Sequence, residues 1–225
     1  MNRIKLFLWV IILCSSCSTS KMLTSDVKPV EVTEMLKIEP FSYISLIETG
    51  NKSIYNASIS SQANTVLNES LERLTRQLRL PSKGIKVNDS FERKKLENEI
   101  NYLVLSAERN RNIKNIGITP MIDSLLRVNN MRFGLIIIQS GFTRAKGNYG
   151  GQVAKGVGLG ILTMGMYVQT PVKSSSAIYA MIVDNKNKNV AFYNKSVLQD
   201  EEPTEEETIT QQLYNIFEKY FFKKK

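Results

Sequence analysis

The sequence predicts a single-domain α/β fold: a sandwich with one mixed β-sheet, a C-terminal β-hairpin and a terminal helix, after a cleaved N-terminal segment. Runs of β-branched and aromatic residues alternate along the chain with segments of helical period. With 225 residues, of which 42% are hydrophobic, the chain has the material for one core. A polar stretch separates the last two β-rich runs, which is typical of a hairpin.

The first sixteen residues have the layout of an export signal. A cationic start, Met1–Lys5, is followed by the apolar run Leu6–Leu13. This run of eight residues is too short to cross the hydrocarbon core of a bilayer as a helix. We therefore expect residues 1–16 to be removed during export.

Cys17 is the expected site of lipid attachment. Ser15 and Ser16 directly before it resemble a bacterial lipobox, in which the cysteine is acylated and becomes the new N-terminus. Acyl chains on Cys17 would hold the protein on the membrane without spanning it. Two alternatives stay open: an ordinary secretory signal that leaves Cys17 as a free thiol, and a disulfide between Cys14 and Cys17.

A flexible, lipidated tether is expected over residues 17–37, and the globular domain over residues 38–225. The tether prediction rests on a polar start and on the lack of a clear hydrophobic period before Lys37. No cluster of Asp or Glu follows Cys17 directly. This favours a protein that is anchored in the outer membrane and faces the periplasm.

The first half of the domain is expected to hold one strand, two helices and a short extended segment. Residues 41–47 are rich in aromatic and β-branched residues and predict the first strand. Apolar residues recur at helical spacing over 58–80 and predict a helix. After an extended segment at 85–87, Asp89 and Glu92 predict a capping box that opens a second helix. The predicted buried stripe of this second helix is Leu96, Ile100, Leu103, Val104 and Ala107.

The second half is expected to hold the central strand and the hairpin. Thr119–Pro120 predicts the start of a third helix. The nearly continuous apolar run 133–138 predicts a central strand that is covered on both faces. Residues 176–183 and 190–196 flank the polar stretch Asp184–Asn189 and predict the hairpin.

The terminal helix has the clearest pattern in the chain. Thr204 and Glu207 predict a capping box at its start, directly after Pro203. Acidic residues near this start and three lysines at the chain end match the two poles of the helix dipole. Its predicted core face is Ile209, Leu213, Ile216, Phe217 and Tyr220.

A glycine-rich insertion is expected over residues 141–172, because seven of the twelve glycines lie between Gly147 and Gly165. One interpretation packs it over the domain's own sheet. Another brings it into contact with the membrane or a second copy, as a small-residue helix face or as a flat strand. A phosphate-binding loop is disfavoured, because neither nucleotide-binding fingerprint is complete.

The contact residues proposed for this insertion are its small and apolar side chains and the cations that bracket them. The predicted membrane or oligomer contacts are Gly156, Gly158, Leu159, Gly160, Ile161 and Tyr167. The predicted contacts to anionic headgroups are Arg144, Lys146 and Lys155. A second interpretation is that these charges only keep the loop solvated.

Much catalytic chemistry is absent from the composition. The chain has no histidine, and both cysteines lie within the first seventeen residues. This excludes imidazole-based nucleophilic triads and zinc sites built on thiolates. We expect no enzyme activity, no cofactor and no metal, and an acid such as Asp184 would have to carry any residual catalysis. Because export is expected, the formal charge of +9 does not indicate nucleic-acid binding.

The order of these features resembles a group of small envelope lipoproteins. The residues that carry the resemblance are the lipobox cysteine, the glycine-rich insertion, and Ile182–Asp184 leading into Val190–Tyr193. The group comprises relatives of the curli-secretion lipoprotein and of the penicillin-binding-protein activator. The resemblance implies a non-catalytic domain, with an envelope protein or further copies of itself as partner.

Two functional hypotheses follow from the sequence. The first is an outer-membrane-anchored binding or assembly lipoprotein that acts through protein contacts. The alternative is a homo-oligomeric pore or secretion component that inserts residues 147–168 into the membrane.

Overall fold

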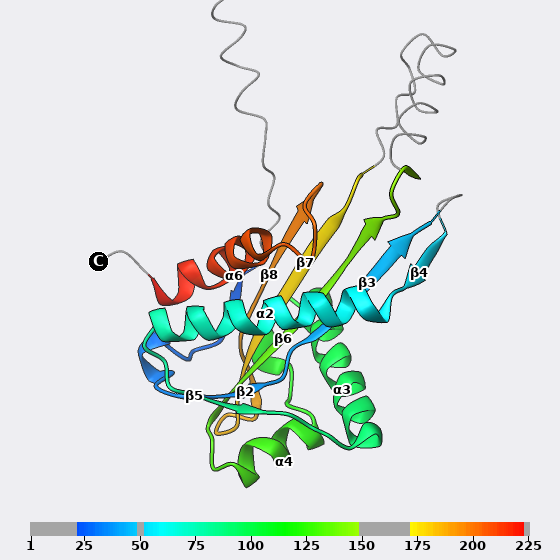
Figure 1. The fold of residues 1–225 in the computed structure, drawn as a ribbon. Helices are drawn as coiled ribbons and strands as arrows, with labels where there is room; N and C mark the ends of the chain where they lie inside the picture. Colours follow the sequence, from blue (N-terminus) through cyan, green and yellow to red (C-terminus); the bar gives the residue numbers. More distant parts are fainter. Residues whose placement is uncertain (1–21, 49–51, 149–171, 223–225) are drawn as a thin grey trace, which may run out of the picture.

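The structure is a computed structural model that describes residues 22–48, 52–148 and 172–222. Within these residues, helices cover both faces of one mixed sheet of eight strands (Figure 1). The α/β fold class expected from the sequence is therefore confirmed.

The elements follow one another in a largely alternating order. The strands are β1 (Leu23–Thr24), β2 (Met35–Ile38), β3 (Phe41–Ile47), β4 (Ser53–Tyr55), β5 (Ser82–Ile85), β6 (Phe133–Arg144), β7 (Ser175–Asp184) and β8 (Asn189–Gln199). The helices are α2 (Ala57–Gln77), α3 (Ser90–Arg109), α4 (Pro120–Val128) and α6 (Glu206–Phe221). Two short 3₁₀ turns are η2 (Pro29–Glu31) and η3 (Ile113–Asn115).

β6 is the central strand of the sheet. It pairs antiparallel with β7 on one side and parallel with β2 and then β3 on the other. The order across the sheet is β1-β8-β7-β6-β2-β5, and β4 extends the sheet beyond β3. The predicted central strand at 133–138 and the predicted hairpin of β7 and β8 are both confirmed.

The two ends of the sheet differ in what they carry. Because β7 is antiparallel to both β6 and β8, these two strands finish at the same end, and β3, which is parallel to β6, finishes there too. We call it the insertion end, since the chain leaves β6 there on its way to β7. The opposite end, the turn end, carries Asn185–Lys188 between β7 and β8, with α4 close by (Figure 1).

The core has two layers, one on each face of the sheet. Side chains of β6 alternate between them: Leu135 and Ile137 pack with α2 and α6, whereas Ile136 and Ile138 pack with α3 and α4. The predicted core face of the terminal helix is confirmed, since all five of its residues are buried in the first layer. Of the stripe predicted for α3, four residues are buried in the second layer and Val104 is partly buried against it.

Helix starts follow the predicted caps in part. The Asp89 carboxylate accepts a hydrogen bond from the Glu92 backbone N–H at 2.8 Å, as expected for the start of α3. The capping box predicted at Thr204 is wrong. The helix begins at Glu206 after Glu205, which makes no side-chain cap, because Thr204 lies in a turn that the Glu205 N–H closes by donating to the Glu202 carbonyl at 3.2 Å.

The flexible tether predicted up to residue 37 is also wrong from Met22 onward. β1 pairs with β8, and β2 lies between β5 and β6. Val27, Val32 and Met35 are buried in the first core layer. Their apolar side chains lack a regular period, which is why the sequence pattern did not reveal them.

Three further boundaries differ from the expectation. β5 covers Ser82–Ile85 rather than 85–87, and the short strand β4 was not expected. β6 continues through Gly141 to Arg144, so the first four residues assigned to the insertion belong to the sheet. A Cβ on Gly141 would lie 2.2 Å from the backbone oxygen of Ser175, so the strand needs glycine at this close approach.

Candidate functional site

Most of the site residues proposed from the sequence lie outside the described residues. These are Cys17, Lys155, Gly156, Gly158, Leu159, Gly160, Ile161 and Tyr167. Arg144 and Lys146 are described and lie at the insertion end. Arg144 ends β6, and its Nε donates a hydrogen bond to the Val172 carbonyl at 2.8 Å. Lys146 is exposed in the turn that follows.

The insertion end is held together by backbone and amide contacts. The Asn148 side-chain amide donates to the carbonyls of Ile47 at 3.1 Å and Glu48 at 2.9 Å. The Lys173 backbone N–H donates to the Asp200 carboxylate at 2.7 Å. These contacts fix the described residues on both sides of the insertion to β3 and to the end of β8.

The charge of the insertion end is mixed. Besides Arg144, its cations are Lys52, Lys146 and Lys173, and its acids are Glu48, Asp200, Glu201 and Glu202. Lys173 Nζ lies 4.0 Å from Glu202. The described residues therefore offer acids beside the predicted headgroup contacts Arg144 and Lys146, and headgroup binding stays a prediction.

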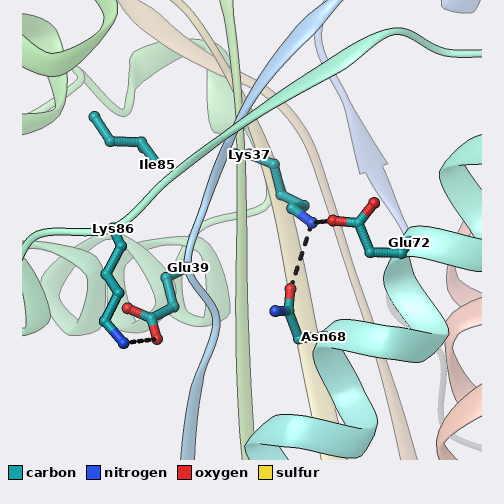
Figure 2. A pocket seen from close by; sticks show the side chains of 7 residues that line it. Lys37, Glu39, Asn68, Glu72, Ile85 and Lys86 are labelled. Carbon is teal, nitrogen blue, oxygen red and sulfur yellow. Dashed lines mark hydrogen bonds and ion pairs between the residues drawn. The ribbon is translucent and has the colours of Figure 1, made fainter.

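A buried lysine marks a pocket that the sequence analysis missed. Lys37 lies on β2 at a core position facing α2 and is only 4% exposed. Its Nζ pairs with the Glu72 carboxylate and lies 3.4 Å from the Asn68 amide oxygen. Figure 2 shows both partners reaching from α2 toward the Lys37 ammonium, while Glu39 and Lys86 form a separate pair.

The pocket beside Lys37 has a volume of about 320 Å³ and balanced charges. Its charged lining residues are Lys37, Lys86, Glu39 and Glu72. Desolvation by burial lowers the pKa of Lys37. A lysine with a lowered pKa can act as a nucleophile, but here Glu72 and Asn68 engage the ammonium. We interpret the cluster as a structural contact between β2 and α2.

Asp184, the acid that could have carried catalysis, is fully occupied by hydrogen bonds. It is 0% exposed. Its carboxylate accepts from Arg132 Nε at 3.1 Å and Nη2 at 2.9 Å. It also accepts from the Lys186 backbone N–H at 2.8 Å and the Asn187 amide at 2.9 Å. A carboxylate with four such donors has no lone pair left for a substrate and fixes the turn between β7 and β8.

Three large apolar side chains are exposed on one side of α3, which also carries the polar residues Lys95 and Asn98. Phe91, Tyr102 and Leu105 are exposed by 79%, 62% and 54%. Spacings of eleven and three residues place them on one side of the helix, opposite the buried stripe that begins at Leu96. Such large apolar side chains on one face are the usual material of a protein interface.

The described ranges hold no helix that is both long and apolar enough to cross a bilayer. They also contain no group of three or more Asp, Glu, Cys or His side chains placed to hold a metal ion.

Comparison with known proteins gave structural neighbours at very low sequence identity. No protein-family model and no curated protein matches the chain. The PelC dodecamer from Paraburkholderia phytofirmans is 7% identical with a TM-score of 0.42, covering 91% of this chain and 97% of its own. A DUF4136 family protein from Bacteroides thetaiotaomicron is 9% identical with a TM-score of 0.32, covering 89% of this chain and 96% of its own.

A third neighbour is the C-terminal domain of LpoB from Salmonella enterica. It is 8% identical with a TM-score of 0.29, covering 78% of this chain and 87% of its own. At such identities and TM-scores, none of these likenesses establishes family membership or function.

Proposed function

We propose that this chain is an outer-membrane lipoprotein that faces the periplasm, is held by acyl chains on Cys17, and acts through protein contacts rather than catalysis. The support for anchoring comes from the sequence. The cationic start and apolar run before Cys17 have the layout of an export signal, and Ser15 and Ser16 complete a lipobox-like site. Lipobox cysteines carry the two or more acyl chains that stable anchoring needs.

The early start of the folded domain supports attachment close to the bilayer. Met22 is the first described residue, and β1 begins directly after it. Cys17 precedes Met22 by five residues, which span at most about 18 Å when fully extended. An acylated Cys17 would therefore keep the domain near the membrane surface.

The exposed apolar side chains on α3 are the observation that carries the protein-contact function. Phe91, Tyr102 and Leu105 expose large side chains there although α3 buries its opposite face fully against the sheet. Burying side chains of this size in an interface would stabilise a complex by about 1.5–3 kcal/mol for each fully buried side chain, before the costs of association. An envelope protein that offers an apolar surface fits this face.

The anchoring is tested by metabolic labelling with a fatty-acid analogue, followed by membrane fractionation. The parent protein is expected to incorporate label and to sediment with membranes, and Cys17→Ala is expected to lose both. Cys14→Ala is the matched control and should keep both. A Cys17→Ala protein that remains labelled, or a parent that is never labelled, would refute lipid attachment at Cys17.

The protein contact is tested by site-specific photo-crosslinking in cells. A photoreactive residue in place of Tyr102 is expected to give one discrete adduct with an envelope protein, and Leu105→Asn in the same chain should abolish it. The control position is Glu69, which is exposed on α2. No adduct from position 102, or the same adduct from position 69, would contradict a partner on α3.

A further inference from the structure

A cationic pocket lies at the turn end of the sheet, beside the pair formed by Arg132 and Asp184. It is formed where the loop between α4 and β6 meets the turn between β7 and β8, and its volume is about 320 Å³. The lining residues are Leu126, Arg127, Asn130, Met131, Arg132, Asn185 and Lys186. Three of these side chains are cationic and none is acidic.

Arg132 is held in a fixed orientation at this pocket. Asp184 engages its Nε and Nη2, and its guanidinium lies 4.5 Å from the centre of the Phe133 ring. An arginine has five N–H donors, so the two on Nη1 stay available beside the pair with Asp184. A guanidinium with restricted motion loses little entropy when it binds an anion.

Arg127 and Lys186 supply two further charges. Both are exposed, and neither forms an ion pair with a described acidic side chain. The acids nearby are Asp184, which is buried, and Glu31, whose Oε2 lies 3.6 Å from Arg132 Nη2. Asp123 is engaged by Lys188 at 2.5 Å. Three cations against Asp184 and Glu31 leave one positive charge in excess.

One backbone hydrogen bond joins the two loops that form the pocket, from the Asn185 N–H to the Arg132 carbonyl at 2.8 Å. A second closes the loop after α4, from the Met131 N–H to the Leu126 carbonyl at 2.9 Å. Asn130 adopts the left-handed conformation that closes α4, with φ of 54°. The pocket is therefore formed before any ligand arrives, which reduces the cost of binding.

We propose that this pocket binds the carboxylate or phosphate group of an acidic envelope molecule. The N–H groups on Arg132 Nη1 can donate to an anionic oxygen, Arg127 and Lys186 add attraction from the rim, and Leu126 and Met131 supply apolar contact beside the charge. The inference is independent of lipidation.

The proposal is tested by calorimetric titration of the full chain with sodium phosphate and, separately, sodium succinate at constant ionic strength. Arg127→Gln/Lys186→Gln leaves the buried pair of Arg132 and Asp184 intact, so the variant should fold, which circular dichroism verifies. Its affinity is expected to fall by about tenfold or more, because two charges at contact distance are lost. The stronger of the two ligands identifies the anionic group.

Lys52→Gln/Lys146→Gln is the matched control, since it removes the same net charge from exposed positions at the insertion end. It is expected to bind as the parent does. If both double variants lose the same affinity, the anion responds to the overall charge of the protein, and binding in this pocket is refuted. Absence of binding by the parent to both phosphate and succinate would overturn it as well.

Discussion

Arg79 adopts a backbone conformation that normally selects glycine. Its φ is 52°, and it follows the end of α2, where its N–H donates to the Arg76 carbonyl and the Leu80 N–H donates to that of Thr75. This is a Schellman arrangement, in which the left-handed position is usually glycine. An L-residue there carries a steric cost that glycine avoids.

Replacing Arg79 with glycine should therefore stabilise the protein, by about 0.5–1 kcal/mol after the entropy cost of glycine in the unfolded chain. Urea denaturation measures the change. Arg76→Gly, three residues earlier in the helix, is the control and should destabilise by about 0.5–1 kcal/mol. If both variants stabilise the protein, or both destabilise it, the assigned role of Arg79 is contradicted.

Lys37 and Glu72 form a pair whose members should respond differently to substitution. Lys37→Met replaces the buried charge with an apolar chain of similar length and should change stability by less than about 1 kcal/mol. Glu72→Gln leaves the buried ammonium poorly compensated and should cost about 1–2 kcal/mol, less than for a fully buried pair because Glu72 is 50% exposed. Glu69→Gln on the same helix should be neutral. If Lys37→Met lowers the free energy of unfolding more than Glu72→Gln does, this interpretation of the pair is contradicted.

The pH dependence of stability should also reveal Lys37. Burial lowers its pKa from 10.5, so between the lowered pKa and 10.5 the unfolded chain binds more protons than the folded one. Stability from this group therefore rises with pH across that interval. In Lys37→Met, the free energy of unfolding should rise less with pH than in the parent. The comparison stops at about pH 10, because tyrosines titrate above it. Urea denaturation at a series of pH values measures this dependence. If the free energy of unfolding rises equally with pH in parent and variant, the assignment is contradicted.

At the scale of the elements, the close approach of β6 and β7 depends on Gly141. Its missing side chain is what allows the strands to pair, so Gly141→Ala should destabilise by about 1–3 kcal/mol through overpacking. Gly117→Ala, where the nearest atom to the new Cβ is 3.8 Å away, should stay within about 1 kcal/mol of the parent. Thermal unfolding of the two variants provides the comparison, and an unchanged Gly141→Ala would show that the strands can separate freely.

Elements with a strong period could be predicted from the sequence, and short or irregular elements could not. The apolar run 133–138 and the core face of α6 identified a central strand and a helix correctly. β1 has only two residues, and Lys37 interrupts the apolar pattern of β2 at a buried position. Their places depend on pairing with β8, β5 and β6, which is tertiary information.

The residues of the cationic pocket could not be predicted from the sequence either, because they too depend on tertiary contacts. Arg132 and Asp184 are 52 residues apart, and they meet because Phe133 pairs with Asp184 across β6 and β7. Once the hairpin and the central strand are known to be neighbours, an arginine just before one strand and an aspartate at the end of the other become a predictable pair. The sequence pattern alone contains no sign of that neighbourhood.

At the scale of the whole molecule, the pairing of β1 limits how far the domain can lie from the anchor. β1 is an edge strand that pairs with β8 at Phe192 and Tyr193, between the two ends of that strand. With at most about 18 Å between Cys17 and Met22, a lipid on Cys17 would keep the β1 edge of the sheet near the bilayer.

The most direct measurement of this account is the mass of the mature protein extracted from its native membranes. Intact-protein and peptide mass spectrometry should find a chain that begins at Cys17 and carries acyl chains on that residue. A mature chain that retains residues 1–16, or that begins elsewhere and carries no lipid, would contradict the account.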